Sequence, residues 1–227
     1  MKAAQLRLLR LADSAFPAGG FAFSSGLEGA HADGLVTSEA DLTAFVHEHV
    51  ALRWHRQDRV LLRRAWPATR ATDDVEVEAA WDAADRLAEA TTGLARLREA
   101  SRRAGRALLG TFAALGCAPA ERLQARVTSG LLHGHLPVAQ AVCLRASGVE
   151  RADAEMLTAW QAASAIVSAG LRLGLVGHVG AQRVLTALEC PVADILATIP
   201  PAEPGGFSAF AEIASCRSHT TPRLFAS

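Results

Sequence analysis

The chain has 227 residues, of which 50% are hydrophobic and 20% charged, and its formal net charge at pH 7 is zero. This composition is typical of a globular protein with a substantial core, and the length allows one large domain or two small ones. Balanced charge argues against a nucleic-acid-binding protein, whose affinity rests mainly on a basic surface. The longest apolar stretch, residues 162–179, contains Arg172 near its middle, which argues against a membrane span.

The four cysteines lie far apart in the sequence and form no CxxC pair. No signal peptide is recognisable before the first predicted helix. We therefore expect a cytoplasmic protein whose thiols are reduced and mostly buried.

The chain begins with a short apolar segment, residues 6–11, which leads into a loop rich in glycine. Pro17 restricts this loop, whereas Gly19 and Gly20 leave it conformationally free. The loop is predicted to place Phe21 for packing or for contact with a partner.

Capping residues predict where the next helices begin. Ser25 can cap a helix, and Glu28, three residues later, can complete a capping box with it. Ser38 is predicted to open a further helix that has Asp41 in its first turn.

Helical spacing of apolar residues continues through most of the remaining chain. Further helices are predicted over residues 73–91, 94–116, from Pro119 onward, and over 137–148, 152–174, 191–199 and 207–216. No alternating β pattern is longer than a few residues, and no internal repeat is visible. We predict an all-α, single-domain helical bundle of roughly 8–11 helices over residues 1–227. A linker is expected near residues 200–206, followed by a C-terminal helix and tail over residues 207–227.

The sequence lacks the motifs of the common nucleotide-binding and hydrolytic sites. No GxxxxGK loop is present, and the single lysine is Lys2, which excludes a P-loop NTPase. The letters AFSSG near Ser24 approach a nucleophile elbow but lack its first glycine, and the chain offers no sheet to carry one. We predict no catalytic residues.

The eight histidines raise the question of a metal site. His47 and His49 are two residues apart, so they lie on different faces of a helix and do not form HExxH. His133 and His135 flank a glycine and could contact a soft transition metal from a loop. No set of three or four ligands has zinc-like spacing, so no permanent metal site and no cofactor are predicted. A transient metal contact at His133 and His135 remains open.

Three other patterns have both a structural and an interaction interpretation. The charged run over residues 98–106 is either a solvated helix face or a partner-binding face. The glycines at 170, 174, 177 and 180 indicate close packing within the chain, or a homodimer or partner contact. Leu224 and Phe225, near the chain end, indicate docking on the chain's own body or on a partner.

Four blocks, taken together, resemble the urease accessory protein F (UreF) family. They are LADSAFPAGGFAFSSGLE (11–28), REASRRAGRALL (98–109), HLPVAQ (135–140) and SAGLRLGLVGHVGAQRVL (168–185). The terminal RLFAS also fits, so the resemblance extends over most of the chain in the right order. It implies an all-helical, non-catalytic scaffold that dimerises and joins urease accessory protein D/H. It further implies recruitment of the urease accessory GTPase G and delivery of nickel to apo-urease.

The resemblance also implies roles for the residues that match the family's motifs. The N-terminal loop would be shaped by Pro17, Gly19, Gly20, Phe21, Ser25, Gly26 and Glu28. The central helix or its contacts would be ordered by Arg98, Glu99 and Ser101. The dimer or GTPase-binding region would include Arg172, Gly174, Gly177 and Gln182. The tail would be held by Arg223, Leu224 and Phe225.

Two other classes of protein stay open as alternatives. One is a metal-dependent helical hydrolase that uses His133 and His135. The other is a generic helical dimerisation module with no part in urease maturation.

Overall fold

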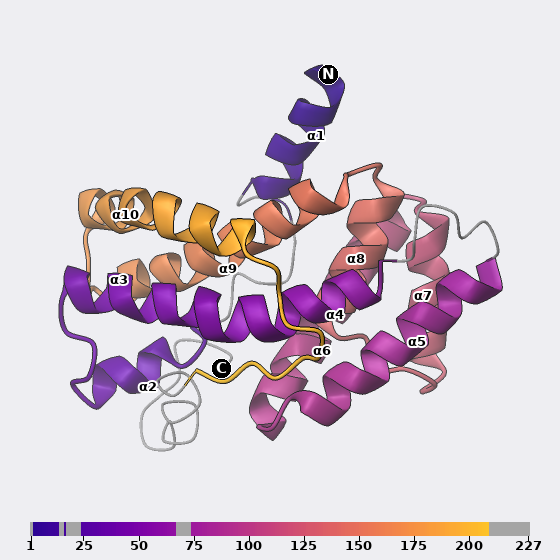
Figure 1. The fold of residues 1–227 in the computed structure, drawn as a ribbon, viewed down its shortest axis with the longest axis horizontal. Helices are drawn as coiled ribbons and strands as arrows, with labels where there is room; N and C mark the ends of the chain where they lie inside the picture. Colours follow the sequence, from indigo (N-terminus) through magenta and orange to yellow (C-terminus); the bar gives the residue numbers. More distant parts are fainter. Residues whose placement is uncertain (1, 14–15, 17–23, 67–73, 209–227) are drawn as a thin grey trace. The chain divides into compact units, whose positions relative to one another are not determined.

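The computed structural model describes residues 2–13, 16, 24–66 and 74–208, and these residues are mainly helical (Figure 1). In chain order the helices are α1 (Lys2–Ala12), α2 (Leu27–Ala32), α3 (Glu39–Glu48), the π-helix η1 (His49–Asp58), α4 (Arg59–Arg64), α5 (Asp74–Thr91), α6 (Ala95–Ala114), α7 (Ala118–Thr128), α8 (Leu136–Ala146), α9 (Arg151–Arg172) and α10 (His178–Ala197). The described residues include no strand, so the predicted all-α class is confirmed. None of the described helices is long and apolar enough to cross a membrane.

The chain divides into two compact units by its internal contacts. Unit 1 comprises Met1–Gly19 and Asp58–Thr158, and unit 2 comprises Gly20–Gln57 and Ala159–Ser227. Each unit has its own cluster of buried apolar side chains. The single-domain organisation stays a prediction.

Unit 1 is built around α6, which packs against α7 and α8, while α4 packs against α5 and α8 (Figure 1). Ala104, Leu108 and Phe112 recur every four residues along α6 and are buried, as an amphipathic helix requires. Gly116 follows this helix with a φ of 76°, a left-handed conformation that glycine adopts without strain. The sequence therefore predicts both the buried face of α6 and the place where the helix ends.

Unit 2 contains α2, α3, η1 except its last residue, α10 and the C-terminal part of α9, and α10 packs against α3. The capping box predicted from Ser38 is present. The Asp41 N–H donates to Ser38 Oγ at 3.1 Å, and the Ser38 N–H donates to Asp41 Oδ2 at 3.0 Å. This cap satisfies donors that the first turn of α3 would otherwise leave unpaired.

The predicted capping box at Ser25 and Glu28 is wrong. The residue before α2 is Gly26, with a φ of 87°, and no side chain caps this helix. Ser25 itself has a φ of 50°, whereas a side-chain N-cap takes an extended backbone. Two successive left-handed residues thus set the entry to α2 instead of a serine cap.

The predicted helix start at Pro191 is also wrong, because Pro191 lies inside α10. A proline in a helix interior removes one backbone hydrogen bond and costs about 3 kcal/mol. Val184, Leu188 and Val192 are buried on both sides of it, and their packing keeps the helix continuous. The predicted C-terminal helix falls largely outside the described residues.

Replacing Pro191 with alanine is expected to raise the free energy of unfolding by about 1–2 kcal/mol. Alanine supplies the missing N–H and removes the clash of the ring with the preceding turn. Thermal unfolding followed by circular dichroism measures the effect as a higher Tm. An unchanged or lower Tm would show that α10 uses the proline for its packing.

Candidate functional site

An extensive polar network lies in unit 1, where α5 and α6 meet the loop before α8. Its centre is Asp85, which is fully buried on the same face of α5 as Trp81 and Ala88. Its carboxylate accepts three backbone N–H groups, from His133 at 2.6 Å, Gly134 at 3.1 Å and His135 at 2.8 Å. The loop therefore closes around a single buried carboxylate, and this carboxylate satisfies three backbone N–H donors of the loop.

His135 links this loop to both helices, and its side chain is 1% exposed. Its Nδ1 lies 3.2 Å from Ser101 Oγ, and its Nε2 lies 2.9 Å from Glu89 Oε2. Burial lowers the pKa of His135, an effect that Glu89 opposes. Both ring nitrogens are thus occupied by protein groups.

Ser101 connects α6 to the first turn of α8. Its Oγ accepts the Leu136 N–H at 3.1 Å, one of the free donors at the start of that helix. The residue before α8 is His135, and its own side chain does not cap the helix. This contact supports the predicted ordering role of Ser101, which stays a prediction.

Glu89 carries the second carboxylate of the network. It pairs with Arg102, and Arg98 Nε lies 3.4 Å from its Oε1. The hydrogen bond from Arg102 is the largest cause that lowers the pKa of Glu89 to about 2. Arg98 also donates through Nη1 to the carbonyls of Thr92 at 2.7 Å and Gly93 at 3.0 Å, which holds the turn between α5 and α6.

A glycine allows the loop to approach α6 this closely. A Cβ placed on Gly105 would lie 2.1 Å from the Gly134 carbonyl oxygen and 2.9 Å from the Leu136 nitrogen. No L-residue with a side chain fits against backbone at these distances. Gly105 is therefore a requirement of the site.

His133 is the more accessible of the two loop histidines, with 41% of its side chain exposed. Its Nδ1 is 3.9 Å from Glu89 Oε2, and its carbonyl accepts from Arg106 Nε at 3.2 Å. Across the described parts of the chain, no three His, Cys, Asp or Glu side chains are arranged to hold a metal ion.

Ser101, His135 and Glu89 form a serine–histidine–carboxylate series, an order of groups that some hydrolases use for nucleophilic catalysis. Here the serine oxygen accepts the first N–H of α8, and the histidine is enclosed. The arrangement therefore fits the positioning of a loop better than attack on a substrate.

Lowering the pH is expected to weaken this network in two stages. Since the folded pKa of His135 is lowered, the unfolded chain binds more protons below about pH 6.5, and stability begins to fall there. The lowered pKa of Glu89 adds a loss as the pH falls from about 4.5 to about 2. After allowance for solvent screening, we expect the Glu89 contribution to be about 1–2 kcal/mol.

Urea unfolding of the wild type and of Glu89→Gln, measured at a series of pH values, tests the second stage. The variant is expected to lose less stability than the wild type between about pH 4.5 and 2. Equal losses in the two proteins would contradict the assignment of this window to Glu89.

The remaining predicted residues of unit 2 lie mainly at helix ends and on exposed surface. Gly174 follows α9 with a φ of 74°, Gly177 precedes α10, and Gln182 is exposed on α10. Arg172, the last residue of α9, is also exposed. In contrast, a Cβ on Gly170 would lie 2.8 Å from Leu42 Cδ2, so this glycine serves packing inside the unit.

Several predicted positions cannot be placed. Those outside the described residues are Pro17, Gly19, Gly20, Phe21, Arg223, Leu224 and Phe225. Glu99 is exposed on α6 beside the network, whereas Ser25, Gly26 and Glu28 belong to unit 2.

Sequence reasoning missed Asp85, Glu89 and Gly105. One signal was available, because Asp85 interrupts the apolar face that Trp81 and Ala88 predict for α5. An acidic residue at a core-facing position is costly unless it is hydrogen-bonded, so it marks a polar contact inside the fold.

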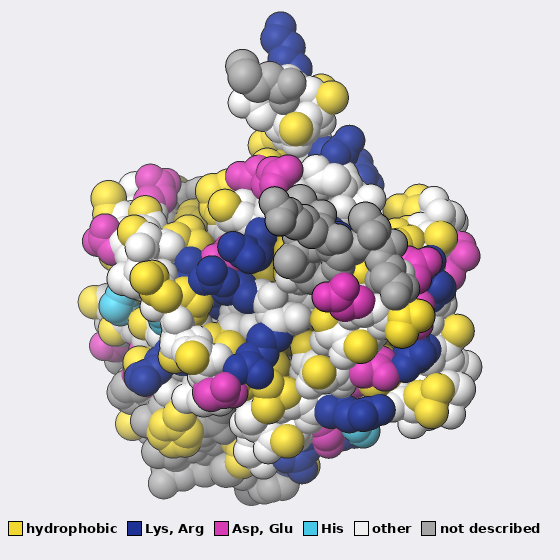
Figure 2. Space-filling model, turned by 45° about the vertical axis from the view of Figure 1, so that its right-hand side comes forward, with side chains coloured by type: hydrophobic (Ala, Val, Ile, Leu, Met, Phe, Trp, Pro, Cys, Tyr) yellow, Lys and Arg dark blue, Asp and Glu magenta, His cyan; other side chains and the backbone are white. Residues whose placement is uncertain are grey.

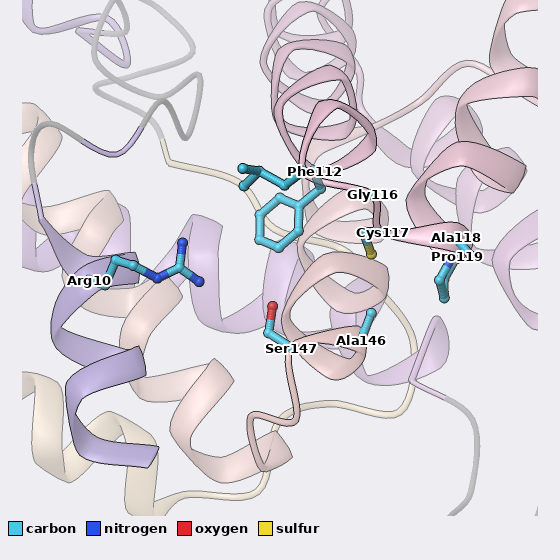
Figure 3. Close-up of a pocket in the computed structure, with 9 residues that line it drawn as sticks. Arg10, Phe112, Gly116, Cys117, Ala118, Pro119, Ala146 and Ser147 are labelled. Carbon is cyan, nitrogen blue, oxygen red and sulfur yellow. The ribbon is translucent and has the colours of Figure 1, made fainter. Parts of the chain in front are cut away.

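A separate hollow of about 390 Å³ lies in unit 1 between the ends of several helices (Figure 3). Its lining residues are Arg10, Phe112, Leu115, Gly116, Cys117, Ala118, Pro119, Ala146 and Ser147. The Arg10 guanidinium points toward Phe112 and Ser147 in this view (Figure 3). The Ser147 hydroxyl donates to the Cys143 carbonyl at 2.9 Å, so it is already engaged.

The surface visible in Figure 2 has basic and acidic side chains interspersed, in agreement with the zero net charge. Ion pairs also connect helices of unit 1. Arg126 of α7, for example, pairs with Asp82 at 2.5 Å and with Glu78 at 3.5 Å, both on α5.

Comparison with known proteins identifies the family. The sequence model of the UreF family matches residues 36–189 of this chain. The chain is 35% identical to the urease accessory protein UreF of Rhizobium leguminosarum bv. viciae, over 99% of this chain and 96% of that protein. It is 32% identical to the protein of the same name from Trichodesmium erythraeum (strain IMS101), over 81% of this chain and 78% of that protein. The match from Actinobacillus pleuropneumoniae is 30% identical over 82% of this chain and 81% of that protein. The chain therefore belongs to the UreF family of urease accessory proteins.

Proposed function

We propose that this chain is a non-catalytic, cytoplasmic scaffold of urease maturation. It forms a homodimer, joins urease accessory protein D/H and recruits the urease accessory GTPase G. The resulting assembly promotes insertion of nickel, the cargo, into apo-urease. The observation that carries this proposal is family membership, with similarity to a relative named urease accessory protein over 99% of the chain.

The geometry of unit 1 supports a scaffold in preference to an enzyme. The polar residues of the network form hydrogen bonds with one another and with backbone groups. The contacts of Asp85, Ser101 and His135 are examples. Such a network fixes the shape of a surface, and its serine and its buried histidine are already occupied by protein contacts.

We assign the predicted residues to two roles. Arg98, Ser101 and His135 position the loop before α8, whereas the exposed Glu99 and Gln182 contact partners. The exposed segment around Gly174 and Gly177 belongs with Gln182 to a dimer or GTPase-binding region. The N-terminal loop and the tail at Arg223 to Phe225 are further partner contacts. His133 is the residue that contacts nickel transiently, because its imidazole is partly exposed.

Co-purification tests the proposal directly. The tagged chain is expressed with its cognate accessory proteins D/H and G, and stoichiometric complexes are expected by size-exclusion chromatography with light scattering. Failure of the folded chain to bind either protein would contradict the scaffold role.

Two surface variants locate the contacts. Glu99→Arg and Gln182→Arg change exposed positions, so their folding should change by no more than about 0.5 kcal/mol. Each is expected to reduce capture of one partner, while Ala79→Arg, an exposed position of α5, serves as the matched control. If all three variants retain wild-type capture, the assignment of these contacts is wrong even where the scaffold role stands.

A further inference from the structure

The helical segment η1 of unit 2 has an unusual backbone. It is a π-helix over ten residues, His49–Asp58, directly after α3. π-helices form i→i+5 hydrogen bonds, are rare, and occur mostly as single turns. A π-helix longer than one turn therefore needs support from tertiary contacts.

The inner side of η1 is anchored in the core of unit 2. Val50 and Trp54 are buried in the apolar cluster of that unit. Two polar residues of η1, Arg53 and Gln57, are also buried. Because a π turn contains more residues than an α turn, a return to α-helical bonding would rotate these side chains away from their present surroundings.

The segment after α10, residues 198–208, lies along η1 and is called the strap below. The Gly205 N–H donates to the Arg56 carbonyl at 3.1 Å, and the Gly206 N–H donates to Gln57 Oε1 at 3.3 Å. At its end, the buried Ser208 donates its hydroxyl to Glu48 Oε1 at 2.9 Å. The strap thus contacts the residue before η1 and the last turn of η1.

Gly206 lies close to the backbone of η1. A Cβ at this position would lie 2.6 Å from Gln57 Cβ, 2.8 Å from the Arg53 carbonyl oxygen and 2.9 Å from the Leu52 carbonyl oxygen. Two of these atoms are backbone atoms of η1, so neither a rotamer change nor a small shift makes room. Gly205, one residue earlier, is exposed, and a Cβ there would meet nothing within 4 Å.

We propose that the strap holds residues 49–58 in the π form. Displacing the strap from η1 returns this segment to α-helical hydrogen bonding. The device couples the position of the chain at Ser208 to the register of a helix in the core of unit 2. It is independent of the urease assignment, because every contact that supports it lies within unit 2.

Hydrogen–deuterium exchange of the full-length Gly206→Ala and Gly205→Ala variants tests the proposal. Peptides within residues 49–58 are expected to exchange about tenfold faster in Gly206→Ala than in the wild type, since the strap contacts are lost together. Gly205→Ala should match the wild type, and peptides of α6 should be unchanged in both variants. Equal exchange of residues 49–58 in Gly206→Ala and the wild type would overturn the proposal.

The crystal structure of Gly206→Ala distinguishes a change of helical register from simple loosening. It is expected to show the strap displaced and i→i+4 hydrogen bonds over residues 49–58. A displaced strap over an intact π-helix would overturn the proposal. Should Gly206→Ala fail to fold, Ser208→Ala removes the bond to Glu48 Oε1, and an unchanged exchange rate over residues 49–58 in that variant would overturn the proposal equally.

Discussion

Asp85→Ala is expected to lower the free energy of unfolding by about 4 kcal/mol. The substitution leaves three backbone N–H groups of residues 133–135 without their acceptor, two of them buried with the carboxylate. Hydrogen bonds to a charged group are worth about 1.5–3 kcal/mol each, and their losses are not fully additive. Since small proteins have only about 5–15 kcal/mol of stability in total, this change should move the urea midpoint substantially.

The control for Asp85 lies one turn earlier on the same helix. Asp82 is also an aspartate of α5, but it forms an ion pair with Arg126 near the surface. Asp82→Ala is therefore expected to cost about 1 kcal/mol or less. Similar losses for the two variants would show that the loop before α8 does not depend on the buried carboxylate.

Gly105→Ala is expected to destabilise the protein by about 3 kcal/mol, although alanine is the better helix former. The added methyl group meets the backbone of residues 134–136, which is itself held by Asp85 and Ser101. Relief requires α6 and the loop to separate, and that separation breaks the hydrogen bonds of the network. Urea unfolding at neutral pH measures the loss.

Gly110→Ala on the same helix provides a comparison of opposite sign. A Cβ at Gly110 would meet only Gln124 Nε2, at an ordinary contact distance of 3.7 Å. Helix propensity then dominates, and the variant is expected to be more stable by about 0.5–1 kcal/mol. If Gly105→Ala were also stabilising, the close approach of the loop to α6 would not exist in solution.

Local sequence signals predict the helices well where a single capping residue or helix breaker determines where a helix begins or ends. The expected helix over residues 73–91 corresponds to α5, and the helix expected over 137–148 corresponds to α8 within two residues at each end. Ser38 with Asp41, and Gly116, act through contacts with near neighbours in the chain. Sequence alone therefore contains the information that fixes these boundaries.

The errors arise where packing outweighs local preference. Pro191 inside α10 lowers the stability of that helix, and the packing of α10 against α3 compensates for this loss. The sequence of α10 alone does not reveal this contact. The π form of η1 is equally hidden, because its apolar spacing does not distinguish it from an α-helix.

The candidate site was predictable only in part. Ser101 and His135 both belong to recognisable blocks, but they are 34 positions apart in the sequence, which conceals that their side chains meet. Their other partners, Asp85 and Glu89, lie in a segment that carries no motif. Because the network joins three separate segments, it forms only when the chain folds. Of its residues, only Asp85 is indicated by the sequence, since it interrupts the apolar face of α5.

The proposed role of this chain in nickel insertion has a direct test. The cognate urease gene cluster is expressed with and without this chain, and the nickel content and activity of the purified urease are measured. We expect assembled but nickel-poor, inactive urease without the chain, and restoration of both nickel and activity when the chain is supplied. Equal nickel content and activity in the two preparations would contradict the claim.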